Sequence, residues 1–171
     1  RAKRAPEGLT RVVVAIDPPA TSGEDSAEAG IVVVGSGHDG VSYVLADASL
    51  HGSPDEWGRQ AIRLYDQFHA DQIVGEVNNG GEMVGFTVKE CAKSLFRDGE
   101  RPSSVIPYVP VRASRGKFTR AEPIAALYTQ GRVRHVGLFP ELEDQMASWV
   151  VGEASPDRLD ALVWALTALV L

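Results

Sequence analysis

Three acidic residues stand where hydrophobic segments end or are interrupted, and a charge in such a place needs a partner. Asp17 follows the apolar run RVVVAI, Glu76 lies near the end of the run QIVGEV, and Asp160 breaks the otherwise apolar final segment. A carboxylate beside a protein core is destabilising unless it is paired or bound to a metal. Carboxylates brought together repel one another, and a divalent cation removes that repulsion. Since hard cations prefer oxygen ligands, the pattern favours a magnesium or manganese site.

Each of these acids also has a purely structural interpretation. Asp17 precedes two prolines and could simply begin a turn. Glu76 could be an acid at the edge of the core that is paired with a basic residue. Asp157, in the sequence SPD, is most simply a stabilising charge at a helix N-terminus. Asp160 is hardest to explain by structure alone, because it interrupts the apolar pattern of its own helix, and the set of three acids favours the metal site.

The segments that must position these acids alternate between extended and helical patterns. Three strands are expected at 11–16, 30–36 and 41–49, joined by a loop and by the tight turn GHDG, which predicts an antiparallel meander. Helices are expected over 53–70, 82–96, 119–131 and 155–171, with another beginning at 140, and strands over 72–77 and 104–111. This order predicts an α/β fold with a mixed sheet, in which the first and fourth strands can be neighbours under the last helix.

The composition is that of a single globular domain. The chain has 171 residues, of which 44% are hydrophobic and 23% charged, enough for one domain with a complete core. Its one cysteine, Cys91, excludes an internal disulfide framework and a thiolate-rich zinc site. No apolar run reaches the roughly 18 residues of a membrane span, and no signal peptide precedes the first strand. We therefore expect an intracellular protein that is not secreted and has no membrane partner.

The charges are distributed unevenly along a chain of net charge −6. Residues 101–135 contain seven Lys or Arg and one acid, whereas residues 140–160 contain six acids and one Arg. A basic segment next to an acidic one suits a protein that holds a polyanion near a cation-binding pocket, although two solvated faces would look the same. Within the basic segment, the loop VRASRGKFTR could follow a phosphate backbone without reading sequence. The basic side chains of this candidate DNA-binding loop are Arg112, Arg115, Lys117 and Arg120.

Other reactive or aromatic side chains have structural interpretations. Among the histidines, His135 in RVRHVG is the one candidate general base, and a structural role is favoured for it. Asp47 ends the third strand near Asp17 and could be a further acid of the site, but a surface acid is favoured. The aromatic residues of the helices fall on apolar faces and are expected in the core rather than as platforms for stacked bases. They are Trp57, Tyr65, Phe68, Trp149 and Trp164.

Five segments together resemble a known family. They are AIDPP, GEVNNGGEMV, RGKFTRAEPIAALYTQGRVRHVG, LEDQM and SPDRLDALVWAL, and the resemblance covers nearly the whole chain, from Arg11 to Leu171. The pattern is similar to the ribonuclease H-like superfamily of nucleases and, within it, to the C-terminal nuclease domain of the large terminase subunit of tailed bacteriophages. The resemblance implies an α/β fold with a ribonuclease H-like mixed central sheet, an antiparallel three-strand meander plus parallel strands, flanked by helices. It also implies a single nuclease domain over residues 11–171.

The resemblance implies a function as well. It predicts a metal-dependent endonuclease that cleaves concatemeric double-stranded phage DNA during genome packaging, by phosphodiester hydrolysis with two Mg²⁺ or Mn²⁺ ions. Carried over by position, Asp17, Glu76 and Asp160 would be the catalytic metal ligands. Asp157 matches a position beside the last ligand that is acidic or histidine in relatives, and its part in metal binding stays open.

The family joins this domain to an upstream ATPase motor. This chain has no G-x-x-x-x-G-K-[ST] phosphate loop, so packaging ATPase activity is not expected from it. The segment RAKRAPEGLT, residues 1–10, is then interpreted as a linker from that missing upstream domain. The implied partners are double-stranded DNA and the ATPase domain of the same polypeptide, and they could include the small terminase subunit and the portal. The implied location is the host cytoplasm.

Two other kinds of function stay open at this point. The segment DRLDALVWAL also resembles the last motif of Holliday-junction resolvases, so a resolvase-like or RNA–DNA hybrid nuclease would keep the fold and change the substrate. Alternatively, the domain could bind DNA or a portal-like partner without catalysis. The presence of all three acids argues against a binding domain, because a degenerate site would be expected to have lost at least one of them.

Overall fold

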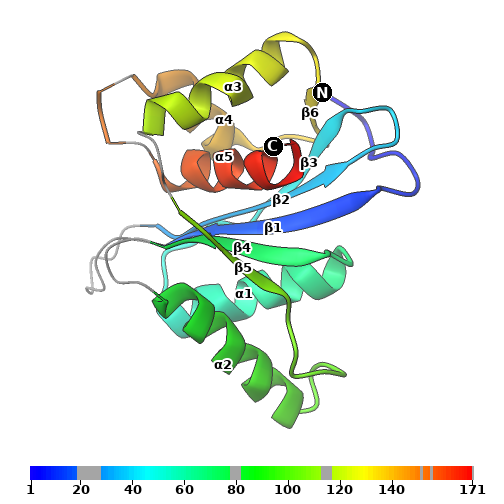
Figure 1. Ribbon diagram of the computed structural model, residues 1–171, viewed down its shortest axis with the longest axis vertical. Coiled ribbons are helices and arrows are strands. Elements are labelled where there is room, and N and C mark those ends of the chain that lie inside the picture. The colour runs from blue at the N-terminus through cyan, green and yellow to red at the C-terminus, as the bar shows by residue number, and fades with distance from the viewer. Residues whose placement is uncertain (19–27, 78–81, 113–116, 151, 155, 171) are drawn as a thin grey trace.

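The computed structural model describes residues 1–18, 28–77, 82–112, 117–150, 152–154 and 156–170. This part of the chain forms a six-stranded sheet of order β5-β4-β1-β2-β3-β6, with helices on both faces (Figure 1). The strands are β1 (Arg11–Asp17), β2 (Gly30–Ser36), β3 (Ser42–Asp47), β4 (Gln72–Glu76), β5 (Tyr108–Val111) and β6 (Val133–His135). The helices are α1 (Pro54–Gln67), α2 (Met83–Arg97), α3 (Lys117–Thr129), α4 (Pro140–Ser148) and α5 (Asp157–Val170).

The sheet combines antiparallel and parallel pairing. β1, β2 and β3 form the predicted antiparallel meander, whereas β4 pairs in parallel with β1, β5 with β4 and β6 with β3. The valine-rich residues of β1 and β2 are buried because these strands lie in the middle of the sheet, with helices on both sides. β5 lies at an edge, where Pro110 can be accommodated without an N–H group. The predicted α/β fold, with a three-strand antiparallel meander plus parallel strands flanked by helices, is confirmed.

The pleat of β1 divides the hydrophobic core into two layers. Val12, Val14 and Ile16 pack with residues of α1 and α2, while Val13 and Ala15 pack with residues of α3, α4 and α5. Figure 1 shows these two groups of helices on opposite faces of the sheet. Since successive residues of a strand point to opposite faces, Asp17 belongs to the face covered by α5.

The helix boundaries follow local signals. α1 begins with the predicted Ser53 cap and Pro54, and Glu56 completes a capping box by accepting a 2.7 Å hydrogen bond from the Ser53 N–H. α3 begins at Lys117, before the expected 119, and continues through Pro123. α5 begins at Asp157, which places Asp160 in its first turn.

The first residues of the chain lie along the outer side of β6 (Figure 1). The Ala2 N–H donates a 2.8 Å hydrogen bond to the His135 carbonyl, and Ala2 forms a parallel bridge with Val136. The Arg1 side chain pairs with Glu143. The segment interpreted as a linker therefore contacts the domain at this end. No helix in the described ranges is long and apolar enough to span a membrane.

Candidate metal centre

Asp17 and Glu76 end neighbouring parallel strands. Ile16 pairs with Gly75 in the register of β1 and β4, so Asp17 and Glu76 are the next residues of the two strands and follow the same alternation. Their side chains leave the same face of the sheet, the one covered by α5. Both residues are buried, with 4% of Asp17 and 5% of Glu76 exposed. The sheet therefore brings the two predicted ligands together at one end.

Asp160 reaches this end of the sheet from the first turn of α5. Gly30 is the cross-strand partner of Asp17, and a Cβ atom at Gly30 would lie only 2.0 Å from the carbonyl oxygen of Asp157. The start of α5 therefore packs directly on the strand beside Asp17, which requires glycine at position 30. Asp160 itself is 5% exposed, and Asp157 is half-buried in the same turn.

Trp164 links α5 to Glu76 by a hydrogen bond. It lies four residues after Asp160, so the two side chains share one face of the helix. The indole Nε1 of Trp164 donates a 3.0 Å hydrogen bond to Glu76 Oε2. The face of α5 that carries Asp160 is therefore the face turned toward Glu76, and the three predicted ligands lie at the same end of the sheet, on β1, β4 and α5.

Arg120 of α3 also reaches Glu76. Its Nη1 lies 3.9 Å from Glu76 Oε2, and its guanidinium carbon lies 4.3 Å from the centre of a Trp164 ring. The side chain is 11% exposed, so Arg120 belongs to the buried site rather than to an exposed loop. Glu76 is therefore paired with a basic residue, as its purely structural interpretation predicts. That residue, Arg120, lies beside the predicted metal ligands.

The first turn of α5 is held by a buried ion-pair network. Arg158 donates to Glu28, with 2.8 Å between its Nε and Oε2, and its Nη1 donates to Asp47. The side chain of Asp47 is 3% exposed, so the expectation of a surface acid is wrong. Burial alone would lower the pKa of Arg158, but the hydrogen bonds to Glu28 and Asp47 outweigh it and raise this pKa. A permanently charged clamp therefore fixes the turn that carries Asp157 and Asp160.

The donor set suits a hard divalent cation in chemistry and location. Asp17, Glu76 and Asp160 offer carboxylate oxygens, and oxygen ligands are those that Mg²⁺ and Mn²⁺ prefer. Among the described residues, however, no group of three or more Asp, Glu, His or Cys side chains is already arranged to hold an ion. The carboxylates share one end of the sheet, and Glu76 is engaged by Trp164 and Arg120.

The remaining residues singled out from sequence lie at several places in the fold. Arg112 is exposed directly after β5, and Lys117 begins α3. Arg115 and residues 78–81 of the segment GEVNNGGEMV fall outside the described residues. His135 is buried at the opposite edge of the sheet, with Nε2 2.7 Å from the Tyr128 hydroxyl and Nδ1 2.9 Å from Glu143. This agrees with a structural role for His135.

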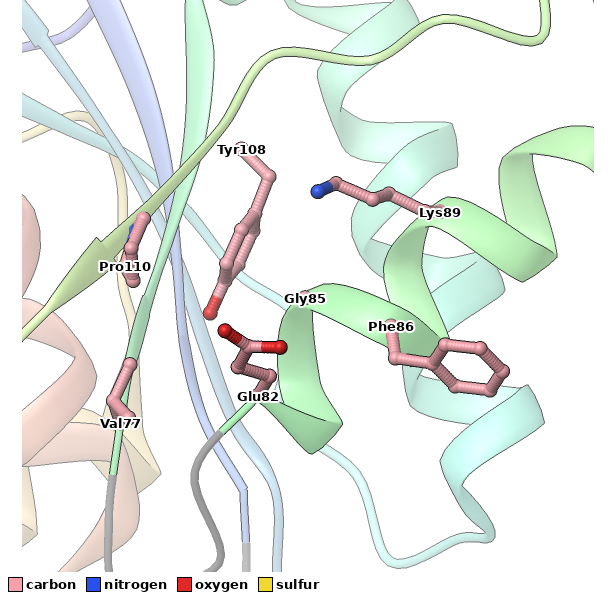
Figure 2. A pocket seen from close by; sticks show the side chains of 7 residues that line it. All are labelled: Val77, Glu82, Gly85, Phe86, Lys89, Tyr108 and Pro110. Atoms are coloured by element: carbon pink, nitrogen blue, oxygen red, sulfur yellow. The ribbon is translucent and has the colours of Figure 1, made fainter.

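A separate pocket lies on the other face of β4. Its volume is about 260 Å³, and it opens between α2 and β5. Figure 2 shows the Tyr108 ring and the Glu82 carboxylate inside it, whereas Phe86 points away. Tyr108 donates a 3.3 Å hydrogen bond to the carbonyl of Gly75, a residue whose alternation is opposite to that of Glu76. The pocket is therefore separated by the sheet from the carboxylates.

The sequence does not predict the contacts of Trp164 and Arg158 with the segments that carry the predicted ligands. The helical pattern predicts Trp164 as a core aromatic, and its spacing of four residues from Asp160 is the one signal of a further role. Arg158 is the single base in the acidic segment 140–160. A lone base beside candidate ligands is a signal for a structural ion pair, but its acidic partners come from distant segments.

The chain matches a protein family and several solved structures. Residues 14–169 match the family described as Terminase RNaseH-like domain. The human cytomegalovirus terminase nuclease domain is similar in fold, with a TM-score of 0.63 and 16% identity over 95% of this chain and 84% of that chain. The large terminase nuclease from thermophilic phage G20c gives 0.61 and 14%, over 92% and 81%. The yeast mitochondrial Holliday junction resolvase Ydc2 gives 0.55 and 11%, over 94% and 80%. No curated protein matches the chain.

Proposed function

The chain belongs to the terminase RNase H-like domain family, and from this premise we propose that it is a metal-dependent endonuclease. Its substrate would be concatemeric double-stranded phage DNA, cut during genome packaging. The observation that supports the proposal is that Asp17, Glu76 and Asp160 are all buried and lie at one end of the sheet, on β1, β4 and α5. Buried acids at one place are costly for a fold that has no use for them.

Asp17, Glu76 and Asp160 would hold two Mg²⁺ or Mn²⁺ ions, with Asp157 as a further ligand beside them. Such ions supply a reactive water at neutral pH and neutralise the charge that develops on the leaving oxygen. The protein's own part is positional. Trp164 orients the Glu76 carboxylate by its hydrogen bond, and Arg158 fixes the turn of α5 that carries Asp160.

The basic residues near this end of the domain would contact the DNA backbone. Arg112 is exposed next to β5, and Lys117 begins the helix that also carries Arg120. Together with Arg115 they would bind phosphates without reading sequence, so binding should weaken steeply as salt is raised. The proposed setting is the host cytoplasm, with residues 1–10 leading from an upstream ATPase domain and with the small terminase subunit and portal as further partners.

Plasmid cleavage tests the proposal directly. Purified protein is incubated with supercoiled plasmid and Mn²⁺, with EDTA as the metal-free control. We expect nicking and linearisation that EDTA abolishes and that Asp17→Asn, Glu76→Gln and Asp160→Asn each lose. Glu90→Gln is the matched control, because Glu90 lies on the surface of α2 and pairs with Lys93. Full cleavage by folded Glu76→Gln protein would reject the assigned site.

A junction resolvase is the second candidate, favoured by the likeness in fold to the Holliday junction resolvase Ydc2. The same protein is offered a four-way junction and a linear duplex of equal length. A terminase-like nuclease is expected to cut both substrates at comparable rates. A strong preference for the junction, with paired symmetrical cuts, would favour the resolvase.

A further inference from the structure

Arg120 places a buried positive charge against the proposed metal ligand Glu76. Its guanidinium is stacked on the Trp164 ring at 4.3 Å, and its Nη1 lies 3.9 Å from Glu76 Oε2. That separation gives an ion pair but exceeds the length of a hydrogen bond. Arg120 therefore stabilises the negative charge of Glu76 electrostatically, without a hydrogen bond.

The hydrogen-bonding capacity of Arg120 is incompletely used. Its Nε is buried and, within the described part of the chain, is the one buried side-chain nitrogen or oxygen without a hydrogen-bond partner. Two other arginines of this protein show the contrast. Arg158 donates to both Glu28 and Asp47, and Arg101 donates two bonds to Asp66. Arg158 and Arg101 form structural ion pairs, whereas the Nε of Arg120 has no hydrogen-bond acceptor among the described residues.

A guanidinium with a long ion pair and an unsatisfied donor is suited to exchange one anionic partner for another. Its planar set of donors matches phosphate oxygens, and the Trp164 ring keeps it in the site by a cation–π contact, whichever anion it faces. A divalent cation on Glu76 would place a second positive charge close to Arg120. The two cations would repel each other, and the carboxylate would no longer need the arginine.

We propose that Arg120 is an exchangeable counter-cation of the metal site. It pairs with Glu76 while no metal is bound. When a metal ion binds Glu76, Arg120 binds a DNA phosphate instead. This inference rests on the proposed nuclease function and adds a distinct consequence to it. The charge of Arg120 opposes metal binding in the absence of DNA and supports DNA binding once metal is present.

The test compares Arg120→Met with Arg120→Lys. Methionine fills the space over Trp164 without a charge, and lysine keeps the charge. Mn²⁺ binding to DNA-free protein is measured by isothermal titration calorimetry. We expect Arg120→Met to bind Mn²⁺ about tenfold more tightly than the wild type, and Arg120→Lys to bind with nearly wild-type affinity. The KM for plasmid cleavage should rise in Arg120→Met, and its melting temperature without metal should fall because buried Glu76 loses its counter-charge, with Mn²⁺ recovering part of that loss.

The outcomes separate this inference from the proposed function. Unchanged or weaker Mn²⁺ binding by folded Arg120→Met, together with loss of binding in Glu76→Gln, would overturn the counter-cation role and leave the metal site intact. Binding of Mn²⁺ by Glu76→Gln as tight as by the wild type would overturn the metal site itself, and the counter-cation role with it.

Discussion

The indole Nε1 of Trp164 donates a 3.0 Å hydrogen bond to Glu76 Oε2 and so joins the middle of α5 to the end of β4. Both residues are buried, and in such surroundings a hydrogen bond to a carboxylate is strong and directional. Asp160 lies one turn earlier on the same helix. One helix therefore supplies a proposed ligand and also orients another, so that a shift of α5 would disturb both.

The first prediction concerns this bond. Trp164→Phe keeps an aromatic ring beneath Arg120 but removes the donor to Glu76. We expect a loss of about 1–3 kcal/mol in unfolding free energy and at least a tenfold decrease in Mn²⁺-dependent plasmid cleavage. Urea denaturation and the cleavage assay measure the two effects. Trp57→Phe, a buried substitution on the opposite face of the sheet, should leave cleavage unchanged; equal losses in both variants would refute an orienting role for Trp164.

The second prediction concerns the contact between β2 and α5. In Gly30→Ala, the new Cβ would meet the backbone of Asp157, and backbone can move only if the first turn of α5 moves with it. We expect a loss of about 1–3 kcal/mol in stability and a marked loss of cleavage. Gly35→Ala is the control in the same strand, because its Cβ would meet mainly the flexible side chain of Leu9. If Gly35→Ala proves as damaging as Gly30→Ala, the contact with α5 is not the cause.

The third prediction concerns the Arg158 clamp. Arg158→Met leaves Glu28 and Asp47 buried without their cation, and breaking a buried pair from one side is strongly destabilising. We expect unfolding free energy to fall by about 3 kcal/mol or more. Arg63→Met serves as the control, since Arg63 and Glu100 form an exposed pair at 3.8 Å whose loss should change stability by no more than about 0.5 kcal/mol. Chemical denaturation measures the unfolding free energy of both variants. Similar losses in the two would contradict a special role for Arg158.

The sequence predicts the parts of this site that depend on single elements. The β-branched runs mark β1, β2 and β4, and the acids at their ends can be identified because an apolar pattern stops there. Asp160 is visible for the same reason in α5. Because β1 and β4 are parallel neighbours in the sheet, Asp17 and Glu76, the residues that end them, lie at the same end of the sheet.

The parts that join distant elements could not be predicted in this way. Asp47 meets Arg158 only because β3 ends beside the first turn of α5, and nothing in the local pattern around Asp47 distinguishes it from a surface acid. Arg120 belongs to a basic segment whose composition suggests an exposed loop, yet the packing of α3 on α5 buries it over Trp164. Local periodicity predicts which face of an element is buried, but it does not say which charges meet across elements.

The fourth prediction concerns the pH dependence of stability. Cys91 is buried between α1 and α2, with its sulfur 3.6 Å from Asp55 Oδ1. Burial and the nearby Asp55 raise the pKa of this thiol from 9.0 to about 11. Between these two values the folded protein keeps a proton that the unfolded chain releases, so stability falls as pH rises from about 9 to 11.

Cys91→Ala isolates this effect, since Cys91 is the only cysteine of the chain. Unfolding free energies of the wild type and the variant are measured by urea denaturation at pH 8 and pH 10. We expect the wild type to lose about 1 kcal/mol more than the variant over this interval. Equal losses would show that the thiol does not carry the dependence. The folded wild type should also react slowly with iodoacetamide at pH 8 and rapidly in urea, because a buried protonated thiol is a poor nucleophile.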